Sequence, residues 1–147
     1  ISVIVNPIPS PVITPGGTVE FCIGDTVTLA SDAVFTYYAW EPTGDATQTT
    51  EWYQSDTVTL TVTNQFGCVG SNEVVLIMNE PMPVSNVTPD GPLEFCVGDD
   101  VNLDAGPGYA SYLWNSGSTT SVVNIIESGD YWVTVLDGNG CIDSSIL

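Results

Sequence analysis

The sequence predicts an all-β protein built from two tandem β-sandwich modules, and three observations support that prediction. Short runs of alternating apolar and polar residues, rich in Val, Thr and Ile, recur along the 147-residue chain. Gly, Pro, Asn and Asp separate these runs at positions typical of turns. No window shows a sustained apolar period of 3.6 residues, so we expect no long helix.

A long internal repeat divides the chain into two modules. Residues 14–29 (TPGGTVEFCIGDTVTL) align with residues 88–103 (TPDGPLEFCVGDDVNL), seventy-four positions later. Trp40 and Trp114 keep this offset, whereas the second cysteines, in QFGC and GNGC, are one position closer together. One residue has therefore been gained or lost between the Trp and the second Cys, and we expect the change in a mid-module loop. A unit of this size is a small domain rather than a solenoid repeat.

The expected strands share the alternating pattern and are residues 26–31, 35–40, 56–64 and 73–79 in the first module, and residues 100–105, 111–114, 120–126, 131–137 and 141–147 in the second. GNG, before the last of these strands, marks a hairpin because Gly and Asn tolerate a positive φ. About seven strands per module, with the order Cys, Trp, Cys, are typical of an immunoglobulin-like sandwich. Trp40, Trp114, Tyr38 and Tyr112 are the expected core aromatics.

Charge composition restricts the function. The chain contains no Lys, Arg or His and eighteen acidic residues, so its formal charge is −18. The absence of a basic patch argues strongly against nucleic-acid binding. An enzyme would also lack a histidine base, a Schiff-base amine and an arginine clamp. Paired carboxylates are a remaining catalytic option, but Glu41, Glu51 and Glu127 show no motif, and we expect no enzyme.

Four cysteines at equivalent places in the two modules favour disulfides and an oxidising, extracellular compartment. If Cys22 pairs with Cys68 and Cys96 with Cys141, each bridge closes a loop of about 45 residues and stabilises its module by ~4 kcal/mol. Zinc is the competing interpretation, but the sequence has no CxxC pair and no histidine. There is no run of eighteen apolar residues and no signal peptide, so we expect no membrane insertion.

The two ends of the chain predict how the modules are bounded. ISVIVNP at the start resembles VVLIMNEP, the last strand of the first module, and the second module stops about four residues short of that strand's expected end. We therefore assign residues 1–6 to a terminal strand of a preceding module or to a donor strand. Residues 7–80 form the first module, and residues 81–147 form the second, with an incomplete last strand.

Two arrangements follow from these ends. The favoured one is a segment of a long tandem array of modules. The alternative is donor-strand exchange, in which Ile1, Val3 and Val5 of one copy complete the sheet of the next copy. Both arrangements predict neighbouring copies or modules of the same protein, joined head to tail, as partners.

The ordered set FCVGDDVNL, SYLW and SGDYWVTVLDGNGC in the second module resembles the immunoglobulin-like/PKD-like repeats of Bacteroidota surface proteins. The first module keeps FCIGDTVTL and YYAW, and its later part, SDTVTLTVTNQFGC, matches more loosely. Repeats of that family occur in giant secreted adhesins, some of them moved along the cell surface during gliding, and in enzymes exported by the type IX secretion system. The resemblance implies a cell-surface spacer or adhesive stalk, with surface glycans as further candidate partners.

The O-glycosylation motif of that phylum is Asp, then Ser or Thr, then a small apolar residue. It is matched at residues 25–27 (DTV) and at residues 56–58 (DTV). Thr26 and Thr57 are therefore candidate glycosylation sites, although Thr is also an ordinary strand residue.

Acidic residues of the second module raise a calcium hypothesis, because calcium binds six to eight oxygen ligands. The candidate ligands lie near the start of one strand and around the last turn, and are Asp99, Asp100, Asp104, Asp137 and Asp143. No DxDxDG loop is present, and Asp residues in turns usually bond the local backbone. Apart from this candidate site, we expect no cofactor.

The alternative function is carbohydrate binding by a module pair of a secreted enzyme. Trp52, Tyr53 and Trp132 are less constrained by the repeat and could form an exposed surface that stacks on sugars. Tyr131 and Trp132 are adjacent in a strand, so one faces the core and the other solvent. The primary prediction is structural or adhesive: extracellular sandwich modules that form a stalk or filament on the bacterial cell surface.

Overall fold

The strands follow the alternation of apolar and polar residues. In β6 (Asp56–Thr63), Val58, Leu60 and Val62 are buried and the residues between them are more exposed, because successive side chains of a strand point to opposite faces. The computed structural model describes residues 1–81 and 87–146, and every regular element in these residues is a strand. The predicted all-β class is therefore confirmed.

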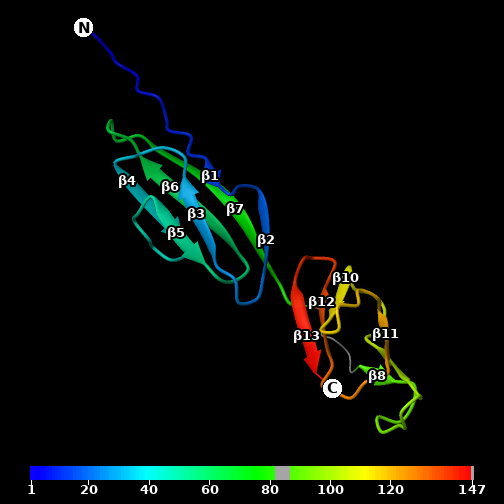
Figure 1. The fold of residues 1–147 in the computed structure, drawn as a ribbon. Helices are drawn as coiled ribbons and strands as arrows, with labels where there is room; N and C mark the ends of the chain where they lie inside the picture. Colours follow the sequence, from blue (N-terminus) through cyan, green and yellow to red (C-terminus); the bar gives the residue numbers. More distant parts are fainter. Residues whose placement is uncertain (82–86, 147) are drawn as a thin grey trace. The chain divides into compact units, whose positions relative to one another are not determined.

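Two units share these strands, Ile1–Asn79 and Glu80–Leu147, and each has two sheets and a core of its own (Figure 1). Both are immunoglobulin-like β-sandwiches. The division falls beside the boundary expected at residue 80. Within residues 1–81 and 87–146 there is no helix with the length and apolar character needed to cross a membrane.

The first unit contains β1 (Ile13–Thr14), β2 (Thr18–Cys22), β3 (Val27–Ser31), β4 (Tyr37–Glu41), β5 (Thr49–Trp52), β6 (Asp56–Thr63) and β7 (Val69–Asn79). One sheet has the order β1-β3-β5 and the other the order β2-β7-β6-β4. The chain changes sheet between β1 and β2, and β2 then pairs in parallel with the second half of β7. The other pairings in this unit are antiparallel.

The described part of the second unit contains β8 (Thr88–Pro89), β9 (Val101–Asp104), β10 (Ser111–Trp114), β11 (Val122–Ile125), β12 (Trp132–Leu136) and β13 (Ile142–Ile146). Its sheets have the orders β11-β9-β8 and β10-β12-β13. They correspond to β5-β3-β1 and to β4-β6-β7 of the first unit. The described residues of the second unit therefore include no counterpart of the β2 ladder.

A buried tryptophan lies in each core. Trp40 is 0% exposed and Trp114 is 1% exposed. Each indole Nε1 donates to a backbone carbonyl in the loop after its strand, Thr47 O at 2.9 Å and Thr120 O at 2.8 Å. The segment between Trp and carbonyl is one residue shorter in the second unit. The single-residue difference between the modules therefore lies in the β4–β5 and β10–β11 connections.

Tyr38 and Tyr112 are partly buried and pack against the two cores. Tyr112 Oη donates to Gly106 O at 2.8 Å, and Tyr38 Oη accepts from Phe35 N–H at 2.8 Å. Tyr38 also makes a T-shaped contact with Phe35, with ring centroids 6.1 Å apart, as Tyr112 does with Tyr109 at 5.6 Å. The equivalent aromatic residues of the repeat thus occupy equivalent places.

Two buried tryptophans of the first unit provide a matched test of core hydrogen bonding. Trp52 is 3% exposed, and its Nε1 has no hydrogen-bond partner within residues 1–81 and 87–146. Trp40→Phe and Trp52→Phe remove the same atoms, but only Trp40→Phe breaks a hydrogen bond. We predict that Trp40→Phe lowers the free energy of unfolding by about 1–3 kcal/mol more than Trp52→Phe does, measured by urea denaturation. Equal losses would contradict this assignment.

Candidate functional site

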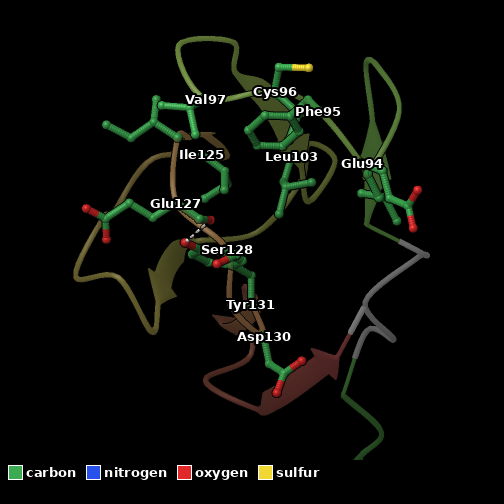
Figure 2. Close-up of a pocket in the computed structure, with 14 residues that line it drawn as sticks. Glu94, Phe95, Cys96, Val97, Leu103, Ile125, Glu127, Ser128, Asp130 and Tyr131 are labelled. Carbon is green, nitrogen blue, oxygen red and sulfur yellow. Dashed lines mark hydrogen bonds between the residues drawn. The ribbon is translucent and has the colours of Figure 1, made fainter.

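The second unit contains an open groove of about 620 Å³. Two backbone segments, residues 93–97 and residues 125–131, form its walls. Figure 2 shows the side chains that surround the opening, among them Phe95, which packs against the core of the unit. Tyr131 Oη donates to Glu127 O at 3.0 Å and so holds the loop of the second wall (dashed line in Figure 2).

The first unit shows what fills the equivalent space. There the second half of β7, residues 75–79, pairs in parallel with β2 on one side. On the other side, residues 74–76 pair in antiparallel register with residues 56–58 of β6. Leu76 points into the core and is only 1% exposed, so this part of β7 closes both the sheet and the core.

The two walls of the groove are the counterparts of these two neighbours of β7. The repeat aligns residues 92–96 with β2. The sheet register aligns β12 with β6, because Trp114 lies opposite Val133 as Trp40 lies opposite Leu60. Extending that register makes the segment just before β12 the counterpart of the first residues of β6.

The strand beside β12 in this sheet is β13, whose described residues end at Ile146. Its last described pairing places Ile146 opposite Trp132. The equivalent pair in the first unit is Glu73 opposite Thr59. The counterparts of the second half of β7 would follow Leu147. Within the described residues 87–146, no strand pairs with residues 93–96 or with residues 126–131. The groove therefore lies where the second half of β7 lies in the first unit.

Apolar side chains line this place and are exposed. Leu93 is 61% exposed and Ile126 is 69% exposed. Val97 is 108% exposed, compared with 52% for its counterpart Ile23 beside β7. Three carboxylates lie on the groove, those of Glu94, Glu127 and Asp130. They have no cationic side chain beside them, because the chain contains no Lys, Arg or His. The site is an apolar slot with an acidic rim.

The cysteines do not form the expected pairs. Cys68 and Cys96 are free thiols, so neither Cys22–Cys68 nor Cys96–Cys141 is formed, while Cys22 and Cys141 are in the disulfide-bonded state. The parallel register places Cys22 opposite Asn79, at the opposite end of β7 from Cys68. β7 has 11 residues, about 35 Å of extended chain, whereas a disulfide needs Cα atoms within about 7 Å.

A similar separation applies in the second unit. Cys96 lines the groove near the residues that precede β12. Cys141 follows the far end of β12, where its backbone N–H donates to Asp137 Oδ1 at 2.9 Å. The predicted disulfide pairs were wrong because equal cysteine spacing in two repeats does not show at which end of a strand each cysteine lies.

The carboxylates considered as calcium ligands are not gathered into a site. Among the described residues, no group of three or more His, Cys, Asp or Glu side chains could hold a metal ion. Three of the five carboxylates accept hydrogen bonds from neutral groups: Asp100 Oδ2 from Asn124 Nδ2 (2.5 Å), Asp104 Oδ1 from Gly106 N–H (2.8 Å) and Asp143 Oδ1 from Ser144 N–H (2.8 Å). The backbone N–H of Asp99 donates to Cys96 O at 3.0 Å.

Asp137, the fifth of these aspartates, caps the β12–β13 hairpin. It is buried, and its Oδ1 accepts from the backbone N–H groups of Asn139 at 2.8 Å and Cys141 at 2.9 Å. Asn64 Oδ1 accepts the two equivalent N–H groups between β6 and β7, at 2.9 and 3.0 Å. A side-chain oxygen at this position therefore closes both hairpins.

A neutral residue also supports an exposed carboxylate. Asn102 Nδ2 donates to Asp90 Oδ2 at 2.8 Å, and the Asn102 backbone N–H donates to Asp90 Oδ1 at 2.8 Å. The side-chain bond first, and then the backbone bond, hold the pKa of Asp90 below its ordinary value. An asparagine here performs the role that a cation has in other proteins.

Two further sets of predicted residues have clear places in the fold. Thr26 and Thr57, the candidate glycosylation sites, are both exposed. Of the candidate sugar-stacking residues, Tyr53 is 71% exposed and Trp132 is 43% exposed. The prediction for Trp52 was wrong, because the alternation of β5 turns this side chain into the core of the first unit.

Residues 1–5 extend from the first unit and belong to none of its strands (Figure 1). Ile1, Val3 and Val5 are 126%, 82% and 89% exposed. The chain becomes attached to the unit at Asn6 and Pro7, whose carbonyls accept from Cys68 Sγ at 3.9 Å and from Asn64 Nδ2 at 2.9 Å. The apolar segment before that point has no cover.

Comparison with known proteins identifies no family. No family model matches the chain, and no curated protein matches it. Among solved structures, it is similar to the Bacteroides ovatus mixed-linkage glucan utilization locus protein SGBP-B, in complex with a mixed-linkage heptasaccharide (13% identity, 94% of this chain, 46% of that chain, TM-score 0.33). It is also similar to the N-terminal four Ig domains of Dscam1 isoform 6.9 (13% identity, 98% and 47% coverage, TM-score 0.35). The chain spans less than half the length of these structures.

The hairpin cap gives a test with a control supplied by the repeat. We predict that Asp137→Ala destabilises the second unit by about 1–3 kcal/mol, because the backbone N–H groups of Asn139 and of the buried Cys141 lose their acceptor. Asp137→Asn should cost clearly less, since Asn64 fills the same place in the first unit. Urea denaturation of both variants measures the difference, and equal losses for Ala and Asn would show that the side-chain oxygen is not what closes the hairpin.

Proposed function

We propose that this chain is a structural or adhesive part of an extracellular protein, in which tandem sandwiches form a stalk or filament on the bacterial cell surface. One observation carries the proposal: two consecutive units have the same fold, and each has its own buried core around its own tryptophan. Modules with separate cores can be added in series without loss of stability to any one of them. In this role the chain performs no catalysis.

The composition supports exposure to an extracellular medium. Both modules lack Lys and Arg, although they differ at many positions, so the whole chain offers no cleavage site to a trypsin-like protease. The charge of −18 keeps the chain soluble and repels anionic surfaces. These properties suit a protein that must persist outside the cell.

Immunogold electron microscopy of intact source cells tests this proposal. We predict that antibodies raised against this chain label fibres or projections at the cell surface, because the modules extend from it. Label that appears only inside permeabilised cells would contradict an extracellular stalk.

Glycan binding is a second candidate function, and Trp132 is the observation that favours it. Its ring lies on the outer face of the β10-β12-β13 sheet, the face opposite buried Val133. Leu113 is 55% exposed on the same face, opposite Thr134, and Ile142 is 64% exposed opposite Leu136, at the far end of β12 from Trp132. An exposed aromatic ring on a partly apolar face can stack on the apolar face of a sugar.

A glycan array examines this second candidate. If the outer face of the β10-β12-β13 sheet binds a glycan, we predict that Trp132→Ala abolishes the signal, because the stacking ring is removed. Tyr53→Ala, which removes an exposed aromatic residue of the first unit, should retain the signal. Absence of any signal from the intact chain would remove glycan binding from consideration.

A further inference from the structure

The outer face of the β10-β12-β13 sheet is uncharged, although the chain as a whole is strongly acidic. We propose that this face binds an uncharged polysaccharide, with the Trp132 ring against a sugar ring and the hydroxyls of Thr134 and Ser144 beside it. The inference rests on glycan binding, the second candidate function, and deepens it by naming the class of glycan and the groups that contact it.

The register shows which residues share this face. Within the three strands the acidic residue is Asp143, which lies opposite the buried Val135 and so belongs to the other face. No outward position of these described strands carries an acidic side chain. The outward positions are Ser111 and Leu113 of β10, Trp132, Thr134 and Leu136 of β12, and Ile142, Ser144 and Ile146 of β13.

The first unit carries charge at the equivalent place. There Thr59 lies between Glu41 of β4 and Glu73 of β7, and both glutamates are exposed on the same face of the sheet. The corresponding row of the second unit consists of Asn115, Trp132 and Ile146. The exposed ring therefore occurs in the row from which both carboxylates are absent.

Charge restricts the class of ligand for this face. The chain has a charge of −18 and repels uronates, sulfated sugars and other anionic glycans. A cationic sugar would find carboxylates beside Thr59 of the first unit, but none in the row of Trp132. An uncharged sugar covers this row without taking any carboxylate out of water. The ligand that fits is therefore uncharged.

The side chains supply both kinds of contact that such a sugar offers. The ring of Trp132 is 43% exposed and can cover the apolar face of a sugar ring. In the next row, about 7 Å along the strand, Thr134 Oγ1 and Ser144 Oγ lie 3.4 Å apart. Each hydroxyl can donate and accept a hydrogen bond, so the pair matches the hydroxyls of a sugar without any charge.

Asn115 fixes the backbone that carries the ring. Its N–H donates to Trp132 O at 3.1 Å, and its Oδ1 accepts from the Trp132 backbone N–H at 3.2 Å. Its Nδ2 also donates to Asp130 O at 3.0 Å. A ring presented from a strand end that is already held loses less conformational entropy when a ligand binds.

The size of the face favours a glycan over a second copy of the chain. The five residues of β12 span about 17 Å and the three strands about 10 Å, which gives about 170 Å². Each partner in a stable protein complex buries about 800 Å². The face is therefore large enough for a short stretch of polysaccharide and too small for a stable protein interface.

An array of uncharged plant, fungal and bacterial polysaccharides, with polygalacturonate and chitosan as charged members, tests the class of ligand. The full chain should bind at least one uncharged polysaccharide and no polygalacturonate. Any binding to chitosan should be the same for the wild-type chain and Trp132→Thr, because it depends on net charge alone. The affinity for the uncharged polysaccharide should change less than about twofold between about 0.01 and 1 M salt.

Substitutions taken from the first unit test the site by calorimetric titration with the polysaccharide that binds. Trp132→Thr, which installs the residue found at Thr59, should weaken binding at least about tenfold, because the apolar area of the ring is lost. Trp132→Tyr should retain binding. Thr134→Val should weaken binding about 2- to 10-fold, whereas Thr61→Val, the equivalent change in the first unit, should leave it unchanged. Urea denaturation of each variant verifies the fold.

Three results would overturn the inference. They are a signal confined to charged glycans, wild-type affinity of Trp132→Thr for the uncharged polysaccharide, and equal effects of Thr134→Val and Thr61→Val. Each of them leaves glycan binding itself in place, whereas an intact chain that binds no glycan removes both the second candidate function and this inference. The immunogold outcome is independent of all four results.

Discussion

The pairing of the second half of β7 with two neighbours is the constraint on which the rest of the structure depends. An inner strand satisfies backbone groups on both of its edges, so a sandwich without it has two unpaired edges and an open core. In the first unit residues 75–79 meet this need, with β2 on one side and β6 on the other. In the second unit the corresponding place is a cleft of about 620 Å³.

A second constraint is the absence of Lys, Arg and His, which decides which groups donate hydrogen bonds to the carboxylates. With no cationic side chain available, carboxylates accept hydrogen bonds from neutral groups: Asn102 for Asp90, Asn79 for Glu20 and Thr50 for Asp45. These bonds fix turns and strand edges without ion pairs. Cohesion then comes from the two tryptophan-containing cores and the β-ladders, and the surface remains strongly acidic.

The sequence predicted the all-β class and most strands, because burial of one face imposes a period of two. It did not predict β2 and β5, which are short and include exposed acidic residues. The cysteine pairs and the exposure of Trp52 were wrong for a related reason: each depends on the register and facing of these two strands. The groove beside residues 93–97 could not be predicted either, because its recognition depends on the long-range parallel β2–β7 pairing, which no local pattern encodes.

Residue-resolved amide hydrogen exchange on the dilute, monomeric chain tests the central claim most directly. Ile23 N–H donates to Asn79 O at 2.9 Å, and Val97 is its counterpart beside the groove. We predict slow exchange at Ile23 and fast exchange at Val97, because Val97 is fully exposed beside the groove. Equally slow exchange at both residues would show that the groove is closed in solution, and would contradict the claim that residues 93–97 form an open edge.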